Sequence, residues 1–196
     1  MPFVPEIRLH KAGPASGLNR LAEADEDFGS PYWAHYWGGG LALARYLIDR
    51  PELVAGRTLL DLGTGSGIVA IAACLAGAAH VVAADIDPYA IIAARLNAAA
   101  NGVTVETLLG DPTLLPPAPI DLLVIGDLFY DPDTAPRVLD LARRHAAAGT
   151  TVLIGDPMRA HLPLALLDEI ARYEVLELTG APGANARPAC VYRLAT

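Results

Sequence analysis

The stretch that decides the fold runs from Leu59 to Gly67 and reads Leu-Leu-Asp-Leu-Gly-Thr-Gly-Ser-Gly. It follows a short apolar strand pattern and leads directly into an apolar helical pattern. About twenty residues later a second strand pattern ends in Asp-Ile-Asp-Pro at residues 85–88. Strand, glycine turn, helix, strand and acid together predict half of a nucleoside-binding fold. In such a fold the glycines let the backbone approach the ligand and the acid accepts hydrogen bonds from ribose hydroxyls.

The spacing of the glycines distinguishes between nucleosides. A dinucleotide fingerprint would require glycine at position 68, where this chain has Ile68. The chain instead has Gly63, Gly65 and Gly67, with Asp61 two residues before the first glycine. This Asp-x-Gly-x-Gly-x-Gly form resembles the first motif of the S-adenosylmethionine-dependent methyltransferases. The resemblance implies S-adenosylmethionine as the cofactor.

The length and composition bound the class of protein. The chain has 196 residues, which is enough for one domain with a full core. Apolar residues make up 53% of it, and residues 62–84 contain no Asp, Glu, Lys or Arg. We expect this run to be a buried helix and strand rather than a membrane span, because glycines and His80 interrupt it. The first ten residues contain Glu6 and Arg8 and lack the apolar core of an export signal.

The charge and the cysteines exclude further classes. A net charge of −8 disfavours a nucleic-acid partner, since the phosphate backbone would be repelled. Cys74 and Cys190 fit no metal-ligand spacing, and we expect no metal site. We interpret both cysteines as buried thiols of a cytoplasmic protein in a reducing compartment.

The order of elements predicts an α/β fold. Residues 1–30 look like an irregular N-terminal extension, and residues 31–196 like the methyltransferase domain. Strand patterns lie at residues 58–62, 80–85, 104–108, 122–126, 150–155, 173–178 and 189–194, and helical patterns at 41–48, 66–76, 89–101, 134–146 and 162–171. The short Gly/Pro-rich link at 180–188 predicts that the last two strands pair antiparallel. We therefore expect a doubly wound, seven-stranded, mostly parallel, Rossmann-like sheet whose last strand is antiparallel.

In such a sheet the ligand lies at the carboxyl ends of the strands. After the first strand we expect Asp61 to meet the ammonium group of the methionine moiety. The loop that contains Gly63, Thr64, Gly65 and Gly67 would contact the cofactor, and amides at the start of the next helix would hold its carboxylate. The alternative is an ordinary tight turn between a strand and a helix.

The second and third strands predict further cofactor contacts. We expect Asp85 to bind the ribose with Ile86 beside it, and Asp87 to cap the next helix. Asp111 follows the third strand, where an acid often accepts a hydrogen bond from the adenine amino group. An equally open interpretation is that Asp111 is a turn residue before Pro112.

The fourth strand predicts the methyl-acceptor site. It ends in Gly126-Asp-Leu-Phe-Tyr-Asp131. Asp127 and Tyr130 could orient an amine there, and Asp127 could also contact the cofactor. Alternatively, Asp127 caps the next segment and the aromatic residues pack in the core. Methylases of adenine amines have two prolines at this point, and this chain lacks them.

Four aromatic residues precede a glycine run: Tyr32, Trp33, Tyr36 and Trp37. Their rings could lie against adenine or the sulfonium, to which ring faces are attracted, and Trp37 is the one that we favour. The alternative is core packing of this segment on the sheet. His35, His80, His145 and His161 have no paired acid or nucleophile in the sequence, and we interpret them as surface or structural residues.

Several stretches together resemble the electron-transfer-flavoprotein β-subunit lysine methyltransferases, from about residue 31 onward. They are Pro31-Tyr32-Trp33-Ala34-x-Tyr36-Trp37-x-Gly39-Gly40-x-Ala42-Leu43-x-Arg45-Tyr46-Leu47, Leu60-Asp61-Leu62-Gly63-x-Gly65-x-Gly67, Asp85-Ile86-Asp87-Pro88, Gly126-Asp127-x-Phe129-Tyr130-Asp131 and Leu153-Ile154-Gly155-Asp156-Pro157-x-Arg159. The resemblance implies methyl transfer to lysine side chains of a folded protein. It places Asp127 and Tyr130 at the acceptor lysine, and Trp37, Gly63, Gly65 and Asp85 at the cofactor. The chain departs from the family by having Met158 where glycine is usual. Related ribosomal-protein lysine methyltransferases usually have an Asn-Pro pair after the fourth strand, which is absent here.

The sequence leaves three alternatives to a protein-lysine methyltransferase. The first is a small-molecule N-methyltransferase with a nicotinamide-like amine acceptor and a closed acceptor pocket. The second is a non-catalytic module that binds S-adenosylmethionine without a usable acceptor site. The third is a nicotinamide dehydrogenase.

Overall fold

The computed structural model describes residues 3–13, 15–25, 28–176 and 186–195. The helices in this part of the chain are α1 (Leu18–Ala24), α2 (Gly38–Asp49), α3 (Ile68–Leu75), α4 (Pro88–Ala100) and α5 (Thr134–Ala147). The strands are β1 (Thr58–Leu62), β2 (His80–Asp85), β3 (Glu106–Leu109), β4 (Leu122–Gly126), β5 (Thr151–Asp156), β6 (Leu167–Val175) and β7 (Arg187–Leu194). Short 3-10 helices lie at η1 (Tyr32–Ala34), η2 (Pro51–Leu53), η3 (Pro112–Leu114) and η4 (Leu164–Leu166).

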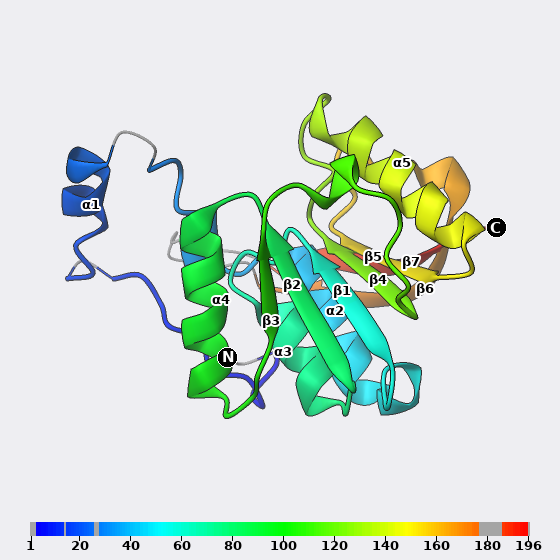
Figure 1. The fold of residues 1–196 in the computed structure, drawn as a ribbon, viewed down its shortest axis with the longest axis horizontal. Helices are drawn as coiled ribbons and strands as arrows, with labels where there is room; N and C mark the ends of the chain where they lie inside the picture. The colour runs from blue at the N-terminus through cyan, green and yellow to red at the C-terminus, as the bar shows by residue number, and fades with distance from the viewer. Residues whose placement is uncertain (1–2, 14, 26–27, 177–185, 196) are drawn as a thin grey trace.

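The strands form one seven-stranded sheet in the order β3-β2-β1-β4-β5-β7-β6 (Figure 1). β1 pairs in parallel with β2 and β4, and the strand order reverses around β1 because β2 and β3 lie on one side of it and β4 and β5 on the other. β7 runs antiparallel to both of its neighbours. The predicted α/β fold and its antiparallel last strand are confirmed.

The central strands β1, β4 and β5 are buried on both faces of the sheet, which explains their apolar runs. Leu59 packs in a core with α2 and α3, and the next residue, Leu60, packs in a second core with α5. The same alternation continues in β4, where Leu122 and Leu123 belong to different cores. Successive side chains of a strand point to opposite faces, so the two cores lie on the two sides of the sheet.

The N-terminal residues divide into two parts. Val4 and Ile7 are fully buried in the core that contains α2 and α3. The amide of Arg8 donates to Asn101 Oδ1 at 2.8 Å, which ties this segment to the end of α4. α1, by contrast, contains no buried residue and lies apart from the sheet in Figure 1. The sequence predicted no helix here, and the domain boundary at residue 30 stays a prediction.

The predicted helix at 162–171 is wrong, because the chain forms η4 there and then the strand β6. The spacing of Leu167, Ile170 and Ala171 is typical of a helical face. In the structure, the pairing of β6 with β7 shifts register between Glu169 and Ala171. This bulge interrupts the alternation of the strand and produces helix-like spacing. The predicted turn at 180–188 falls mostly outside the described residues.

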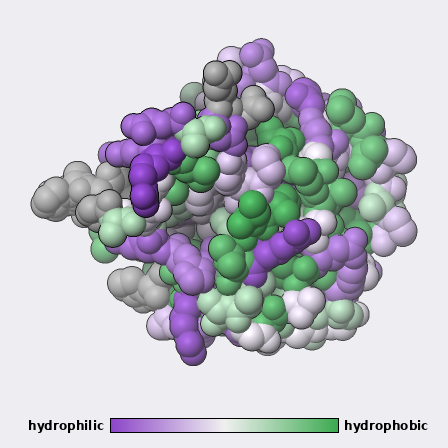
Figure 2. Space-filling view, turned by 60° about the vertical axis from the view of Figure 1, so that its left-hand side comes forward, coloured by the Kyte–Doolittle hydropathy of each residue, from purple (hydrophilic) through white to green (hydrophobic). Residues whose placement is uncertain are grey.

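Apolar side chains are also exposed on the α4–β3 side of the molecule. They include Ile92 and Leu96 on α4, Leu109 at the end of β3, and Leu114 and Leu115 in the segment that follows. Figure 2 turns this side toward the reader and shows hydrophobic patches interspersed with hydrophilic ones. None of the helices in the described part of the chain combines the length and the apolar character that a bilayer crossing requires.

Candidate functional site

A cavity of about 540 Å³ lies at the carboxyl ends of β1, β2 and β4. Its volume falls within the range of small-molecule and cofactor sites. The cavity brings together nearly all of the sequence-predicted site residues. Those that line it are Trp37, Asp61, Gly63, Thr64, Gly65, Asp85, Ile86, Asp111, Asp127 and Tyr130.

Asp61 supports the glycine loop from below. One of its carboxylate oxygens accepts hydrogen bonds from Thr64 Oγ1 at 2.6 Å and from the amide of Ala70 at 3.1 Å. The residue is 1% exposed, and this burial raises the pKa of Asp61 to about 6. A buried carboxylate that lines a cavity gains by meeting a cation there, because the cation offsets the cost of removing the charge from water.

The glycines of the loop have backbone conformations that other residues rarely adopt. Gly63 has φ 66°, and a Cβ atom on it would lie 2.7 Å from the Leu128 side chain. Gly67 has φ 81°, and its Cβ would lie 3.0 Å from the Cα of Ala94 in α4. Gly67 therefore packs α3 against α4 and is outside the lining of the cavity. Its predicted contact with a cofactor stays a prediction.

Asp85 joins the loop to the end of β2. Its Oδ2 accepts from the amide of Gly65 at 2.9 Å. Its Oδ1 accepts from the hydroxyl of Tyr32 at 2.8 Å and from the amide of Asp87 at 3.1 Å. Burial, and then the charge of Asp85, raise the pKa of Tyr32 well above its usual range. Asp87 caps α4 as predicted, since its Oδ1 accepts from the amide of Tyr89 at 2.7 Å.

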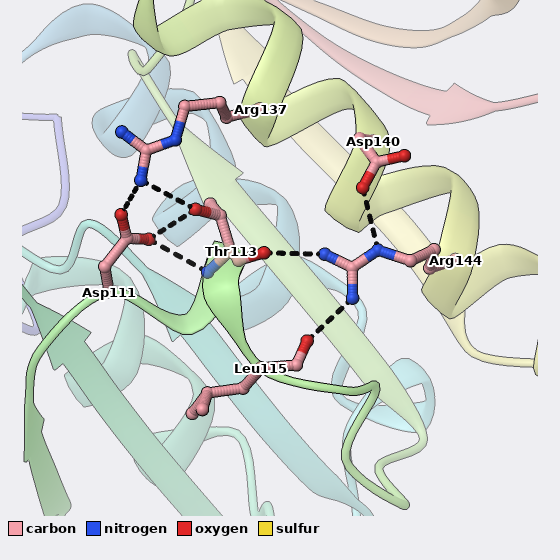
Figure 3. A network of polar contacts seen from close by, with 6 residues as sticks. All are labelled: Asp111, Thr113, Leu115, Arg137, Asp140 and Arg144. Carbon is pink, nitrogen blue, oxygen red and sulfur yellow. Dashed lines mark hydrogen bonds and ion pairs between the residues drawn. The ribbon is translucent and has the colours of Figure 1, made fainter.

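Asp111 belongs to a polar network between η3 and α5 (Figure 3). Its Oδ1 accepts from the amide and hydroxyl of Thr113, and its Oδ2 pairs with Arg137. Burial raises the pKa of Asp111, but the bonds to Thr113 and the charge of Arg137 outweigh it and lower the pKa overall. The residue caps η3 and also lines the cavity. A contact of Asp111 with adenine stays a prediction.

The same network holds the η3 segment against α5. Arg144 donates to the carbonyl oxygen of Thr113 at 2.7 Å and to that of Leu115 at 2.6 Å. Its Nε donates to Asp140 Oδ2 at 2.8 Å, which fixes the guanidinium on the helix. Figure 3 shows Arg137 and Arg144 extending from α5 toward this segment. The cavity wall after β3 is therefore anchored by two arginines that sequence reasoning missed.

Asp127 is held from two sides at the end of β4. Its Oδ2 accepts from the amide of Gly40 in the first turn of α2 at 2.8 Å, and its Oδ1 accepts from Arg159 Nη2 at 2.8 Å. The residue is 9% exposed and has φ 59°, a left-handed conformation. Burial raises the pKa of Asp127, while Arg159 and the amides of α2 oppose that shift. Sequence reasoning found Asp127, but it did not predict either partner.

The neighbours of Asp127 in the sequence take different positions. Phe129 is fully buried in the core with α5, as the packing alternative held. Tyr130 is 59% exposed and lines the cavity. The loop after β4 therefore presents Asp127 inside the cavity and Tyr130 at its edge.

The contact between α2 and Asp127 depends on a close approach of two glycines. Gly39 in α2 lies against Gly155 in β5, and a Cβ on Gly39 would lie 2.1 Å from the carbonyl oxygen of Gly155. A Cβ on Gly155 would lie 2.2 Å from the carbonyl oxygen of Gly39. Only residues without side chains permit this distance, which places the start of α2 beside the ends of β4 and β5.

The aromatic segment divides between the cavity and packing. Tyr32, Tyr36 and Trp37 line the cavity, and Trp37 Nε1 donates to the carbonyl oxygen of Tyr32 at 3.2 Å. Trp33 instead stacks on Tyr89, with ring centroids 6.0 Å apart. Both interpretations of this segment therefore apply, each to different residues.

The histidines and cysteines differ in part from expectation. His35 lines the cavity, His145 is buried beside Thr150, and His80 pairs with Glu106 on the surface. Cys190 is buried, Cys74 is only partly buried, and both thiols are free. The described residues contain no group of three or more side chains that could hold a metal ion.

Comparison with known proteins assigns the family. The model of the ribosomal protein L11 methyltransferase (PrmA) family matches residues 44–125. A solved L11 methylase from Lactobacillus delbrueckii subsp. bulgaricus has 26% identity and a TM-score of 0.52, covering 78% of this chain and 77% of its own. The Pyrococcus abyssi tRNA (uracil-54, C5)-methyltransferase, solved with S-adenosyl-L-homocysteine, shares the fold with a TM-score of 0.57 and 17% identity, covering 82% of this chain and 40% of its own.

The curated relatives are closer in sequence. The electron transfer flavoprotein beta subunit lysine methyltransferase of Xenopus laevis is 43% identical over 188 residues, which cover 91% of this chain and 75% of that protein. Relatives of the same name match at 43–48% identity over most of the chain. This chain therefore belongs to the electron transfer flavoprotein β-subunit lysine methyltransferase family.

Proposed function

We propose that this chain transfers methyl groups from S-adenosylmethionine to lysine side chains of a folded protein, and that its substrate is the β subunit of an electron transfer flavoprotein. One observation carries the proposal. The Asp85-bound glycine loop and the pinned carboxylate of Asp127 open onto the same cavity. This arrangement supports a cofactor site beside an acceptor site, which methyl transfer requires. The named substrate of the Xenopus laevis relative supports the choice of acceptor.

The residues of the cavity fit the cofactor. Asp61 would meet the ammonium group of the methionine moiety, which would compensate its buried charge. Asp85 would accept hydrogen bonds from the ribose, in place of the hydroxyl of Tyr32. Trp37 would lie near the sulfonium, and Asp111 would face the adenine end. When bound, the cofactor supplies a methyl group on a positively charged sulfur.

The acceptor site would then align the amine and accept hydrogen bonds from it. The lysine nitrogen would first lose a proton to water. It would then bond to the methyl carbon as the carbon–sulfur bond breaks and its electron pair stays on sulfur. A free lysine has a pKa of about 10.4, and entry into a narrow channel disfavours its charged form. Asp127 would accept a hydrogen bond from the amine, and Tyr130 would shape the channel. Alignment alone contributes up to about 7–11 kcal/mol, so no strong general base is required.

The charge and the cysteines of the chain bear on its substrate class and its compartment. A net charge of −8 argues against a nucleic-acid substrate. The two free thiols suit a reducing compartment such as the cytoplasm. We propose residues 31–196 as the methyltransferase domain, with residues 1–30 as an extension.

Radiolabelled methyl transfer tests the proposed function. The purified chain is incubated with methyl-tritiated S-adenosylmethionine and recombinant electron transfer flavoprotein, and mass spectrometry locates the modified residues. We expect label on lysines of the β subunit. In Asp127→Asn, where the amide oxygen can still accept from Gly40, we expect a loss of at least about a hundredfold in rate because the amine is no longer aligned by a carboxylate. Label confined to small molecules would refute the protein acceptor. Wild-type rates in the variant would refute the role of Asp127.

A further inference from the structure

A guanidinium stands at the acceptor end of the cavity, and the mechanism above does not use it. Arg159 lines the cavity together with Asp127 and Tyr130. Its Nη2 lies 2.8 Å from Asp127 Oδ1, and its guanidinium carbon lies 5.8 Å from the centre of the Trp37 ring. The side chain is 25% exposed. The Arg159 guanidinium therefore lies between two predicted functional residues, Asp127 and Trp37.

The backbone of Arg159 is held in place as well as its side chain. Its amide donates to Asp156 Oδ1 at 2.6 Å, and Asp156 is fully buried at the end of β5. Met158, between them, has φ 66°, a conformation that costs free energy for a residue with a side chain. A strained turn anchored by a buried acid sets the direction of the arginine.

The charges around Asp127 show what the arginine does. The groups that face Asp127 are Arg159, the buried Asp156, and the amides of Gly39 and Gly40 at the positive end of α2. Asp156 has the same sign as Asp127, and the two raise each other's cost of ionisation. Among these groups, Arg159 is the one that carries a full positive charge. Without it, two buried carboxyls would share a poorly solvated site.

We propose that Arg159 is a positioning residue that keeps the Asp127 carboxylate ionised and aimed at the incoming amine. An ionised Asp127 can accept hydrogens from the amine, whereas a protonated one would donate its own. Because Arg159 already balances the charge of Asp127, the pair does not hold a lysine in its ammonium form. The inference rests on the proposed function for the identity of the acceptor, but not for the state of Asp127.

Two substitutions and one control separate this role from a structural one. Arg159→Gln removes the charge and keeps hydrogen-bond donors, and Arg159→Lys keeps the charge. Arg172→Gln is the matched control, because Arg172 pairs with Glu169 on β6 outside the cavity lining. Circular dichroism and thermal unfolding establish that each variant is folded. If Arg159→Gln does not fold, Arg159→Lys still tests whether the geometry of the guanidinium controls the pKa of Asp127.

The first readout needs no activity. Carbon-13 NMR follows the aspartate carboxyl carbons from pH 3 to pH 9, and Asp127→Asn assigns the signal of Asp127. We expect the pKa of Asp127 to rise by at least about one unit in Arg159→Gln, by less in Arg159→Lys, and not to change in Arg172→Gln. An unchanged titration of Asp127 in Arg159→Gln would overturn the inference.

The second readout is the pH profile of methyl transfer to the protein substrate. In Arg159→Gln we expect the acid limb of kcat to move to higher pH, so that the loss of rate is greatest at low pH and is partly regained as the pH rises. KM should change by less than kcat, and Arg159→Lys should restore part of the rate. Superimposable profiles would refute the inference. Absence of any lysine labelling by the wild type would refute the proposed function, while the NMR titration still decides the role of Arg159.

Discussion

Substitution of Gly39 by alanine tests whether the approach of α2 to the sheet builds the site. The new Cβ would lie 2.1 Å from the carbonyl oxygen of Gly155 and 2.8 Å from Asp127 Oδ2, although real Cβ contacts almost never fall below 3.0 Å. The obstacle at Gly155 is backbone, so α2 or β5 must move by about 1 Å. Such overpacking costs about 1–3 kcal/mol, and occasionally more.

Gly40→Ala is the matched control one residue along the same helix. Its Cβ would lie 3.4 Å from the nearest atom, Ile68 Cγ2, which is an ordinary contact. Alanine is favoured over glycine in a helix by roughly 0.5–1 kcal/mol. The two variants therefore share the change in helix propensity and differ in the clash. Because the gain in helix propensity cancels, the expected difference between them is the cost of the clash, about 1–3 kcal/mol.

Thermal unfolding followed by circular dichroism measures this difference. For a chain of this length, 1 kcal/mol corresponds to about 2–4 °C in Tm. We expect Gly39→Ala to unfold at least about 2 °C below Gly40→Ala, and to lose methyl transfer because the amide of Gly40 moves away from Asp127. Equal Tm values for the two variants would refute the reasoning, and so would full activity in Gly39→Ala.

Three further predictions concern the cofactor end of the cavity. In the wild type, burial raises the pKa of Asp61 from 3.8 to about 6, so ionisation of this group lowers the stability of the folded state as pH rises between these values. The Asp61→Asn variant lacks this effect. The stability of the variant relative to wild type, measured by urea unfolding without cofactor, should therefore increase by up to about 3 kcal/mol from pH 4 to pH 7, and a constant difference would contradict this. Asp85→Ala should weaken S-adenosylmethionine binding by at least about tenfold in calorimetry, because it removes a charged acceptor, and undiminished affinity would exclude the ribose role. Arg144→Ala should weaken cofactor binding severalfold by loosening the η3 segment, whereas the exposed neighbour Arg143→Ala should not; equal affinities would show that the anchor does not matter.

The sequence predicted the fold in most of its detail, because the relevant signals are local. β1, β2 and β4 have the bounds that their sequence patterns predict, and α4 begins directly after the Asp87 cap. β6 was misread because a bulge at one position imitates helical spacing. Such a bulge is defined by the pairing with β7, which no local pattern contains.

The site could be predicted only as far as residues at strand ends. Asp61, Asp85 and Asp127 were found because the carboxyl ends of parallel strands meet at one edge. The bond from Arg159 to Asp127 spans 32 residues along the chain, and the network from Arg137 to Asp111 spans 26. These contacts depend on how helices and loops pack, so spacing in the sequence does not reveal them.

The distribution of tryptophan has a practical consequence. The chain contains two tryptophans, and they are Trp33, stacked on Tyr89, and Trp37, in the cavity wall. Both precede α2 within five residues of each other, so the whole indole emission of the protein originates beside the site. A ligand that enters there should change the colour or intensity of that emission without any added dye. Intrinsic tryptophan fluorescence should therefore report ligand binding in rapid-mixing experiments as well as in titrations.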